Sequence, residues 1–257
     1  MITLPPLTIL ITGATGGIGG ALAEVYAESG NTLILQGRNA IRLAELSAIC
    51  EVQGARVLTC VLDVRNRDEL STWLRQICQQ ELVDLVIVNA GVNTNIGSDG
   101  AGERWEDVQA LIEINVLAAM ATVDAVLPSM RTRGNGQIAL MSSLAAYFGL
   151  PITPSYCASK AALKAYGEAL RGWLEPEGIR INVVMPGYVE SRMCHEMPGP
   201  KPFLWSAEKA AHAIKHGLAR NQPRISFPFP LNFGTWFLSV LPPQISERIL
   251  QLFNYHG

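Results

Sequence analysis

The sequence predicts an α/β protein built on one doubly wound parallel sheet. Short apolar runs alternate with helical stretches along most of the chain, the pattern of repeated βαβ units. A turn rich in glycine, T-G-A-T-G-G-I-G, follows the first apolar run and precedes a helical stretch. The 257 residues, 49% of them hydrophobic, suffice for one sizeable core.

The expected elements follow one another without a linker, repeat or low-complexity tract. Buried strands are predicted at 8–11, 33–35, 56–62, 83–88, 137–141 and 179–185. Helices are predicted at 21–28, 40–51, 67–80, 103–130 and 154–175. We therefore expect one Rossmann-type domain over residues 1–257, with helices on both faces of its sheet. Ligands of such sheets bind beyond the carboxyl ends of the strands.

The glycine-rich turn indicates a dinucleotide site. Gly13 permits a tight turn, and Gly17 and Gly19 allow the backbone to approach a pyrophosphate closely. The helix that starts there offers free N–H groups and a positive dipole end to phosphate. A glycine turn without a ligand is the alternative, and the strand–turn–helix context favours the cofactor.

The segment Y-C-A-S-K places Tyr156 and Lys160 four residues apart, on one face of the expected helix. A phenol has an ordinary pKa near 10, and a nearby positive charge lowers it. Such a group exchanges a proton with an alcohol or ketone oxygen. By itself such a pair is far more often an ordinary pair of residues on an amphipathic helix. Together with the glycine turn it predicts an oxidoreductase.

The end of the second strand, L-I-L-Q-G-R-N, indicates whether the cofactor carries a 2′-phosphate. An NAD enzyme of this type places an acid where this chain has Gly37. Arg38 follows, and its guanidinium suits a 2′-phosphate. We expect NADP(H) to be preferred over NAD(H), moderately, since Gly16 stands where a second basic residue is often found. The alternative is that Arg38 only caps or pairs with the next helix.

Charge and cysteine usage narrow the functional class. A net charge of −2 argues against nucleic acid. Five scattered cysteines without C-x-x-C indicate a reducing compartment and no zinc site, and His212 and His216 lack a third metal ligand nearby. The start shows no signal peptide, and no apolar stretch is expected to reach the length of a membrane span. We expect a cytoplasmic protein without a metal.

Further motifs make the chain resemble the short-chain dehydrogenase/reductase family over roughly residues 7–195. Thr12–Gly19 matches T-G-x-x-x-G-x-G, and 89–91 matches N-A-G. Ser143 precedes Tyr156 by the thirteen residues typical of the family. The segment 186–191 resembles P-G-x-V-x-T, with Ser191 in place of threonine.

The resemblance implies the site residues. Tyr156 would be the general acid or base, Lys160 would lower its pKa, and Ser143 would bond the substrate oxygen. Asn115 would position a water in a proton relay, or would only kink its helix. Ser142 competes with Ser143, but adjacent residues at a strand end point oppositely. The implied cofactor contacts are Gly13, Thr15, Gly17, Ile18, Gly19, Arg38, Asn39, Asp63, Val64, Asn89, Ala90, Gly91, Tyr156, Lys160, Pro186, Gly187, Val189 and Ser191. For Asn89, support of the loop is the stronger expectation.

The last quarter of the chain suggests an apolar substrate. The family places a variable substrate lid at 191–205, where this chain has flexible and aromatic residues: Met193, Met197, Phe203 and Trp205. An apolar tail follows at 225–257, ending in a helix expected to carry Ile245, Ile249, Leu250, Leu252 and Phe253 on one side. The tail could pack under the sheet, form a subunit interface or touch a membrane surface peripherally. We expect packing on the protein or a second subunit ahead of membrane contact.

The expected function is NADP(H)-dependent interconversion of a ketone or aldehyde and a secondary alcohol, with an apolar substrate of medium or large size. The resemblance also implies a homodimer or homotetramer, assembled through the helices that begin at 103 and 154. The alternative is a catalytically silent NADP(H)-binding regulator or scaffold, against which the intact Ser143, Tyr156 and Lys160 argue. An epimerase or dehydratase of the same fold is disfavoured by the chain length.

Overall fold

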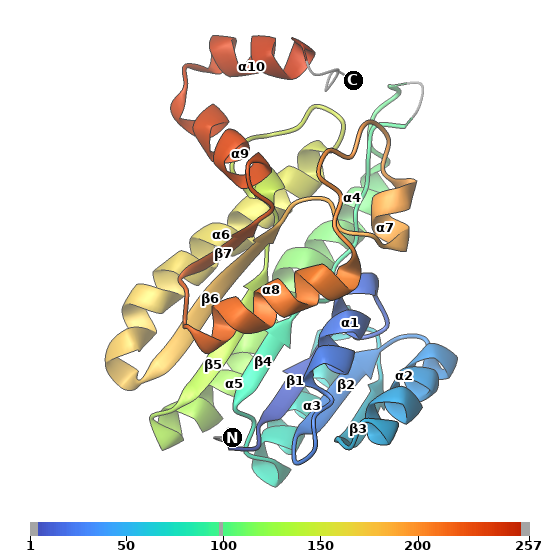
Figure 1. The fold of residues 1–257 in the computed structure, drawn as a ribbon, viewed down its shortest axis with the longest axis vertical. Helices are drawn as coiled ribbons and strands as arrows, with labels where there is room; N and C mark the ends of the chain where they lie inside the picture. The colour runs from blue at the N-terminus through green and yellow to red at the C-terminus, as the bar shows by residue number, and fades with distance from the viewer. Residues whose placement is uncertain (1–4, 98–99, 253–257) are drawn as a thin grey trace.

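A computed structural model describes residues 5–97 and 100–252 of the protein. Its seven parallel strands lie in the order β3-β2-β1-β4-β5-β6-β7 (Figure 1). They are β1 (Thr8–Ile11), β2 (Thr32–Gly37), β3 (Arg56–Val61), β4 (Leu85–Val88), β5 (Gly136–Met141), β6 (Ile179–Pro186) and β7 (Arg224–Phe227). The strand order reverses between β1 and β4, so the predicted doubly wound, Rossmann-type sheet is confirmed.

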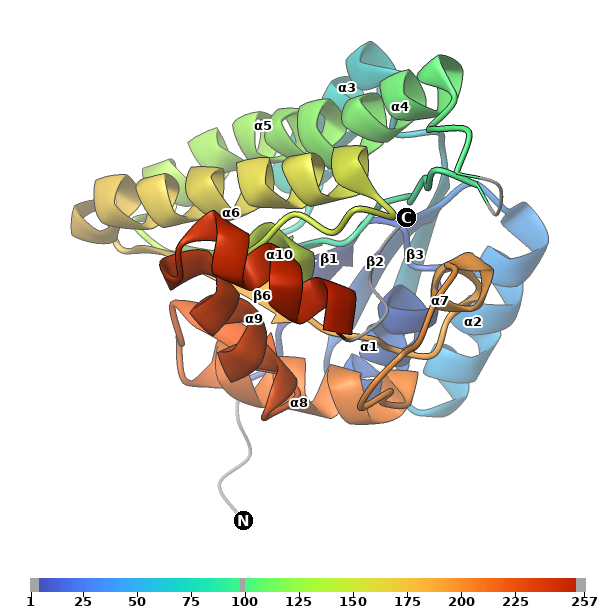
Figure 2. The same cartoon turned by 90° about the horizontal axis from the view of Figure 1, so that it is seen from above.

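Helices cover both faces of this sheet (Figure 2). On one face lie α1 (Gly17–Tyr26), α2 (Ala40–Val52) and α8 (Ala207–Ala219). On the other lie α3 (Arg67–Gln80), α5 (Ala119–Arg133) and α6 (Pro154–Leu174). The sheet is thus the middle of three layers.

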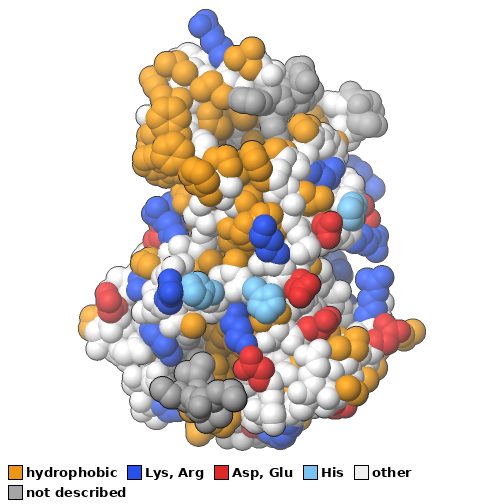
Figure 3. Space-filling model, in the orientation of Figure 1, with side chains coloured by type: hydrophobic (Ala, Val, Ile, Leu, Met, Phe, Trp, Pro, Cys, Tyr) orange, Lys and Arg blue, Asp and Glu red, His pale blue; other side chains and the backbone are white. Residues whose placement is uncertain are grey.

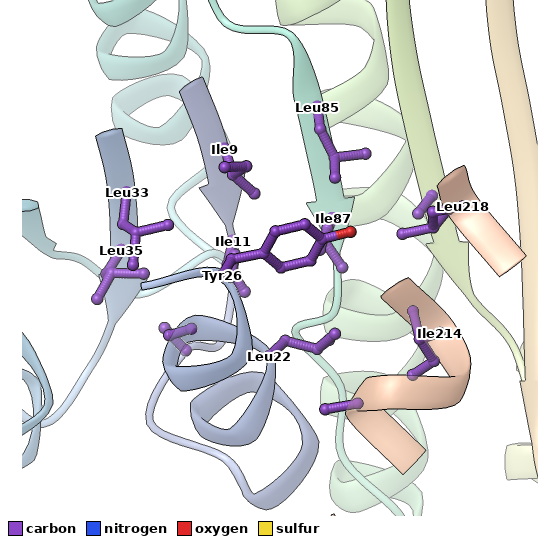
Figure 4. Close-up of a cluster of buried hydrophobic side chains, with 14 of the residues drawn as sticks. Ile9, Ile11, Leu22, Tyr26, Leu33, Leu35, Leu85, Ile87, Ile214 and Leu218 are labelled. Carbon is purple, nitrogen blue, oxygen red and sulfur yellow. The ribbon is translucent and has the colours of Figure 1, made fainter. Parts of the chain in front are cut away.

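The two cores follow from the alternation of side chains along each strand. Ile9 and Ile11 of β1 point toward α1 and α8, where Leu22 and Ile214 meet them (Figure 4). Leu10, between them, packs into the opposite core. Complete burial of such side chains stabilises the fold by about 1.5–3 kcal/mol each. Strands buried on both faces have to be apolar throughout, which explains the uninterrupted runs in the sequence.

The helix expected at 103–130 is divided in the structure. α4 (Trp105–Ile112) continues through a π-helical turn, Glu113–Ala118, into α5. The combined helix, Trp105–Arg133, is long and apolar enough to cross a membrane, so the expectation that no stretch reaches that length was wrong. In the fold, 56% of its most apolar window is buried. It owes its apolar character to its place against the sheet, where Val123 and Val126 are fully covered.

The segment from 225 onward is not a simple tail. Its first residues complete β7, which pairs with β6 as the edge strand of the sheet. Two short helices follow, α9 (Leu231–Val240) and α10 (Pro243–Leu252), and they lie beyond the carboxyl ends of the strands rather than under the sheet (Figure 1). The Ser246 hydroxyl donates to the Leu238 carbonyl at 2.8 Å, which fixes α10 on α9.

The expected apolar side of the last helix is covered by the protein only in part. Leu250 is buried and Ile249 is partly buried, whereas Ile245 and Leu252 are 47% and 83% exposed, and Ser246 is buried as well. Phe253 lies outside the described residues. The apolar spacing alone did not distinguish a side chain that meets protein from one that meets solvent.

Candidate active site

A cleft of about 1860 Å³ runs along the carboxyl ends of the strands. It begins at the glycine turn between β1 and α1 and passes the ends of β4, β5 and β6. It ends among α9, α10 and the short helix α7 (Arg192–Glu196). The cleft therefore lies at the switch point of the strand order, where ligands of such sheets bind.

The glycine turn is shaped for close approach of a ligand and of its own neighbours. Gly13 has a φ of +65°, and a Cβ there would lie 2.7 Å from the Ala90 Cα. A Cβ on Gly19 would lie 2.5 Å from the Gly13 carbonyl oxygen. α1 starts at Gly17 without a side-chain cap, so its first N–H groups remain available to phosphate. The cradle fits a dinucleotide.

Asn89 fastens the turn to the end of β4. Its amide donates to the carbonyls of Thr12 and Gly13, both at 3.0 Å. In return, the Thr12 hydroxyl accepts from the backbone N–H groups of Asn89 and Ala90 at 3.0 and 3.1 Å. This geometry supports the loop-holding role expected for Asn89, although the residue also lines the cleft.

Ser143 and Tyr156 meet in the middle of the cleft. The Ser143 hydroxyl donates to the Pro186 carbonyl at 3.4 Å and accepts from the Ala145 N–H at 3.2 Å. Its interaction with the Tyr156 side chain lowers the pKa of the phenol, and both residues line the cavity. Ser142 turns the other way, and its hydroxyl donates to the Lys160 carbonyl at 2.7 Å within the protein. The structure thus separates the two serines as their positions at the end of β5 predict.

Burial is the largest influence on the pKa values of Tyr156 and Lys160. It raises the pKa of Tyr156 to about 12, against a smaller lowering by the bond to Ser143. It also lowers the pKa of Lys160 to about 8, because a charged amine is poorly solvated there. The Lys160 ammonium lies 5.5 Å from the Tyr156 ring centre and donates to the Met141 carbonyl at 2.8 Å. The lowered phenol pKa expected from the sequence is therefore not found in this structure, because the desolvation of Tyr156 outweighs the lowering by Ser143.

Asn115 lies in the π-helical turn and is fully buried. Its amide donates to the Val92 carbonyl at 2.9 Å and to the Ser159 hydroxyl at 3.0 Å, and its oxygen accepts from the Val92 N–H at 2.8 Å. A Cβ on Gly91 would lie 3.3 Å from the Asn115 oxygen and 3.4 Å from the Lys160 nitrogen. Asn115 therefore stands behind Gly91, close to the lysine, rather than on the cleft wall.

At the end of β2 the structure places two arginines on the cleft wall, Arg38 and Arg42. Arg42 was not anticipated; it lies in the first turn of α2, which places it on the cleft wall. A Cβ on Gly37 would lie 2.9 Å from the Thr15 methyl group, so Thr15 fills the place of a side chain at that position.

Two expected cofactor contacts at this end, Asn39 and Asp63, are not among the residues that line the cleft. Asn39 caps α2 by accepting from the Arg42 N–H at 3.0 Å. Asp63 pairs with Arg65 at 2.7 Å and with Arg38 at 3.7 Å, and the bond to Arg65 lowers the pKa of its carboxyl. The remaining expected contacts line the cavity: Gly13, Thr15, Gly17, Ile18, Gly19, Arg38, Val64, Asn89, Ala90, Gly91, Tyr156, Lys160, Pro186, Gly187, Val189 and Ser191.

The expected lid, 191–205, lines the cleft with the apolar side chains of Met193, Met197 and Phe203 and with the charged side chains of Arg192 and Glu196. Trp205 does not line the cleft; its ring stacks on Phe227 at 5.0 Å between centres, and its backbone N–H donates to the Tyr188 carbonyl, so it anchors the lid. Further lining residues come from α9 and α10, for which the sequence offered only a general apolar composition.

Comparison with known proteins agrees with this geometry. The model of the short chain dehydrogenase family matches residues 7–200. An uncharacterized oxidoreductase of Myxococcus xanthus is 35% identical over 237 residues, covering 91% of this chain and 92% of that protein. The ketoacyl reductase HetN of Nostoc sp. is 35% identical over 192 residues, 74% of this chain and 66% of its own length.

A solved structure is also close. The short-chain dehydrogenase from Sphingobium yanoikuyae in complex with NADPH superposes with a TM-score of 0.77 at 25% identity, over 88% of this chain and 89% of that one. The motifs, the cleft and these relatives agree. The chain belongs to the short-chain dehydrogenase/reductase family and is an NAD(P)-dependent oxidoreductase.

Proposed function

We propose that the protein interconverts an apolar ketone and the corresponding secondary alcohol with NADP(H). The observation that carries this proposal is the position of Ser143 and Tyr156. It lies between the glycine cradle and the apolar end of one continuous cleft. The name of the ketoacyl reductase among the relatives supports carbonyl reduction.

The residues of the site account for the proton in this reaction. The bound cofactor would supply or accept the hydride. Ser143 would hold the substrate oxygen by a hydrogen bond, and Tyr156 would give its phenolic proton to that oxygen during reduction. With a pKa of about 12, Tyr156 is protonated at neutral pH, which suits a proton donor. The Lys160 ammonium, 5.5 Å from the ring centre, would stabilise the phenolate that remains. Asn115, next to the lysine across Gly91, would belong to the proton route to solvent.

The preference for NADP(H) rests on the end of β2. Thr15 occupies the space beside Gly37, where an NAD enzyme of this type would carry an acidic side chain. Arg38 and Arg42 both line the cleft, and guanidinium groups suit the charge of a 2′-phosphate. The NADPH complex of the Sphingobium yanoikuyae relative is consistent with this preference.

The expected homodimer or homotetramer has a matching surface. Trp105, Leu117 and Trp173 are 66%, 40% and 58% exposed on α4, the π-helical turn and α6. These are the helices through which assembly is expected, and large exposed apolar side chains are typical of interfaces. We propose assembly through this surface and a cytoplasmic location.

NADPH consumption with a panel of ketones tests the proposed function. Turnover of apolar ketones by the wild-type protein, and a fall of about 10²–10⁴-fold in Tyr156→Phe, are expected because the variant lacks the proton donor. Calorimetric titration should show that Tyr156→Phe still binds NADPH. Tight NADPH binding by the wild type without turnover of any ketone would favour the silent regulator instead.

A further inference from the structure

We infer that α9 and α10 form a subsite for the alkyl tail of the substrate, so that the preferred ketones carry an extended hydrocarbon chain. This inference rests on the proposed function and assigns the part of the substrate far from the carbonyl. It starts from the chemical character of the cleft beyond Ser143, which differs from that of the cofactor end.

The part of the cleft that α9 and α10 line, which we call the arm, has an uncharged lining. Among the described residues from 230 to 250, those that line the cleft are Pro230, Leu231, Phe233, Gly234, Thr235, Phe237, Leu238, Ile249 and Leu250. Thr235 is the one with a polar side-chain group, and its hydroxyl donates to the Leu231 carbonyl at 3.0 Å. A polar substituent would therefore lose its water without gaining a partner, whereas an alkyl chain loses nothing.

The arm begins at the reaction centre. Leu144 directly follows Ser143, and it packs in one cluster with Val183, Met185 and Leu231 at the start of α9. Leu238 lies two turns further along α9, and the Ser246 bond joins α10 to it. An apolar wall thus runs from Ser143, where the substrate oxygen would be held, to α9 and α10, away from the cofactor end of the cleft.

The arm also opens to the surface. Phe233 and Phe237 line the cleft and are nevertheless 56% and 44% exposed. In Figure 3 hydrophobic side chains gather over this upper part of the molecule, where Figure 1 shows α9 and α10. A chain longer than the arm would lie along these aromatic rings, so the arm favours long chains without a fixed upper length.

Gly234 offers a way to fill the arm without disturbing the fold. It lines the cleft, and a Cβ at this position would have nothing within 4 Å. Gly234→Leu therefore places four carbon atoms in open space and also improves the helix propensity. Ser239→Leu adds the same side chain to the same helix at an exposed position that does not line the cleft, and serves as the control.

The experiment measures binding of 2-butanone, 2-hexanone, 2-octanone and 2-decanone by calorimetry to protein saturated with NADP⁺, with which a ketone cannot react. In wild type and Ser239→Leu, affinity should rise by up to about fourfold per added methylene. In Gly234→Leu, the affinity for 2-decanone should fall by roughly tenfold or more, whereas that for 2-butanone stays unchanged. The same pattern is expected in kcat/KM with NADPH.

Two outcomes would overturn the inference: equal affinity of the wild type for all four ketones, or an unchanged chain-length dependence in Gly234→Leu. Chain-length-dependent binding that Gly234→Leu abolishes, but without NADPH consumption in the wild type, would support the apolar subsite and refute the proposed reaction. The two proposals therefore fail separately.

Discussion

The two ends of the cleft are built in different ways. At the cofactor end, glycines pack against backbone atoms at distances that leave no room for a side chain, and Asn89 and Thr12 fix the strand ends to one another. At the α9–α10 end, large side chains surround open space, and Gly234 has nothing within 4 Å of its Cβ position. The first end is constrained by contacts within the protein, and the second is free to fit a ligand.

This contrast predicts where substitutions cost stability and where they change only ligand preference. Between the two ends lies the reaction centre, where Lys160 is buried and the pKa values of Lys160 and Tyr156 are shifted. Substitutions at the centre and at the cofactor end should therefore have the larger effects, and those on α9 the smaller ones.

The largest effect is expected for Lys160→Met as a function of pH. The folded-state pKa of about 8 lies below the ordinary 10.5, so the unfolded chain binds more protons between these values. Burial of the charged lysine costs about 3 kcal/mol below pH 8, and this cost disappears as pH rises toward 10.5. Relative to wild type, Lys160→Met should therefore be more stable at pH 7 than at pH 10 by about 2–3 kcal/mol in urea unfolding.

Lys164→Met provides the control for this measurement. Lys164 lies one turn further along α6, is only partly buried and pairs with Glu168 at 3.2 Å. Its substitution should not make the protein more stable at pH 7 than at pH 10. A pH-independent stability difference for Lys160→Met would mean that its amine is not desolvated as the structure indicates.

Arg38→Ala should remove most of the preference for NADPH. A charge-assisted contact with the 2′-phosphate contributes about 1.5–3 kcal/mol, so the KM for NADPH should rise roughly 10–150-fold while that for NADH changes little. Arg65→Ala is the matched control, because Arg65 bonds the same Asp63 but does not line the cleft. Equal affinity of the wild type for both cofactors would contradict the assignment.

Gly19→Ala tests the tight packing of the cofactor end. The added methyl group would lie 2.5 Å from the Gly13 carbonyl oxygen and 2.6 Å from the Asn89 amide, so the free energy of unfolding should fall by about 1–3 kcal/mol. At the neighbouring Gly20 the nearest atom is 3.5 Å away, and Gly20→Ala should leave stability unchanged or raise it. Similar unfolding free energies for the two variants would show that the turn yields easily.

The smallest effect is expected at Phe233, which lines the cleft but is 56% exposed. Phe233→Ser should change the free energy of unfolding by no more than about 0.5 kcal/mol, and the Kd for NADPH should stay that of the wild type. Thermal and urea unfolding measure the first quantity and calorimetry the second. A loss above about 1 kcal/mol would indicate that α9 contributes to the core after all.

The sequence predicted the sheet and the cofactor end well, because both depend on local rules. The first strand, 8–11, and the helix 67–80 are found at the predicted residues. Strand β7 was missed since four edge residues followed by prolines carry too short a pattern. Arg42 and the α9 lining depend on how distant segments meet, and no local pattern encodes that.

The pKa shift of Tyr156, unlike the position of the residue, could not be predicted from the sequence. The positions of Tyr156 and Lys160 were predictable from helix geometry, but the direction of the phenol's pKa was not. Two opposing effects act on it, and their balance depends on how completely the surrounding protein excludes water. That degree of burial is a property of the assembled fold.

The π-helical turn at Glu113–Ala118 has a geometric consequence for the long helix that contains it. Each residue of an α-helix advances the chain by about 100°, and a turn with i→i+5 bonds accommodates one more residue. Everything after the turn is thus rotated by about that angle relative to an uninterrupted helix. The turn sets the rotational phase between two helical segments: Asn115 faces Val92 and Ser159, while Val123 and Val126 still face the sheet. Deleting a single residue here would force the helix to give up one of these two alignments.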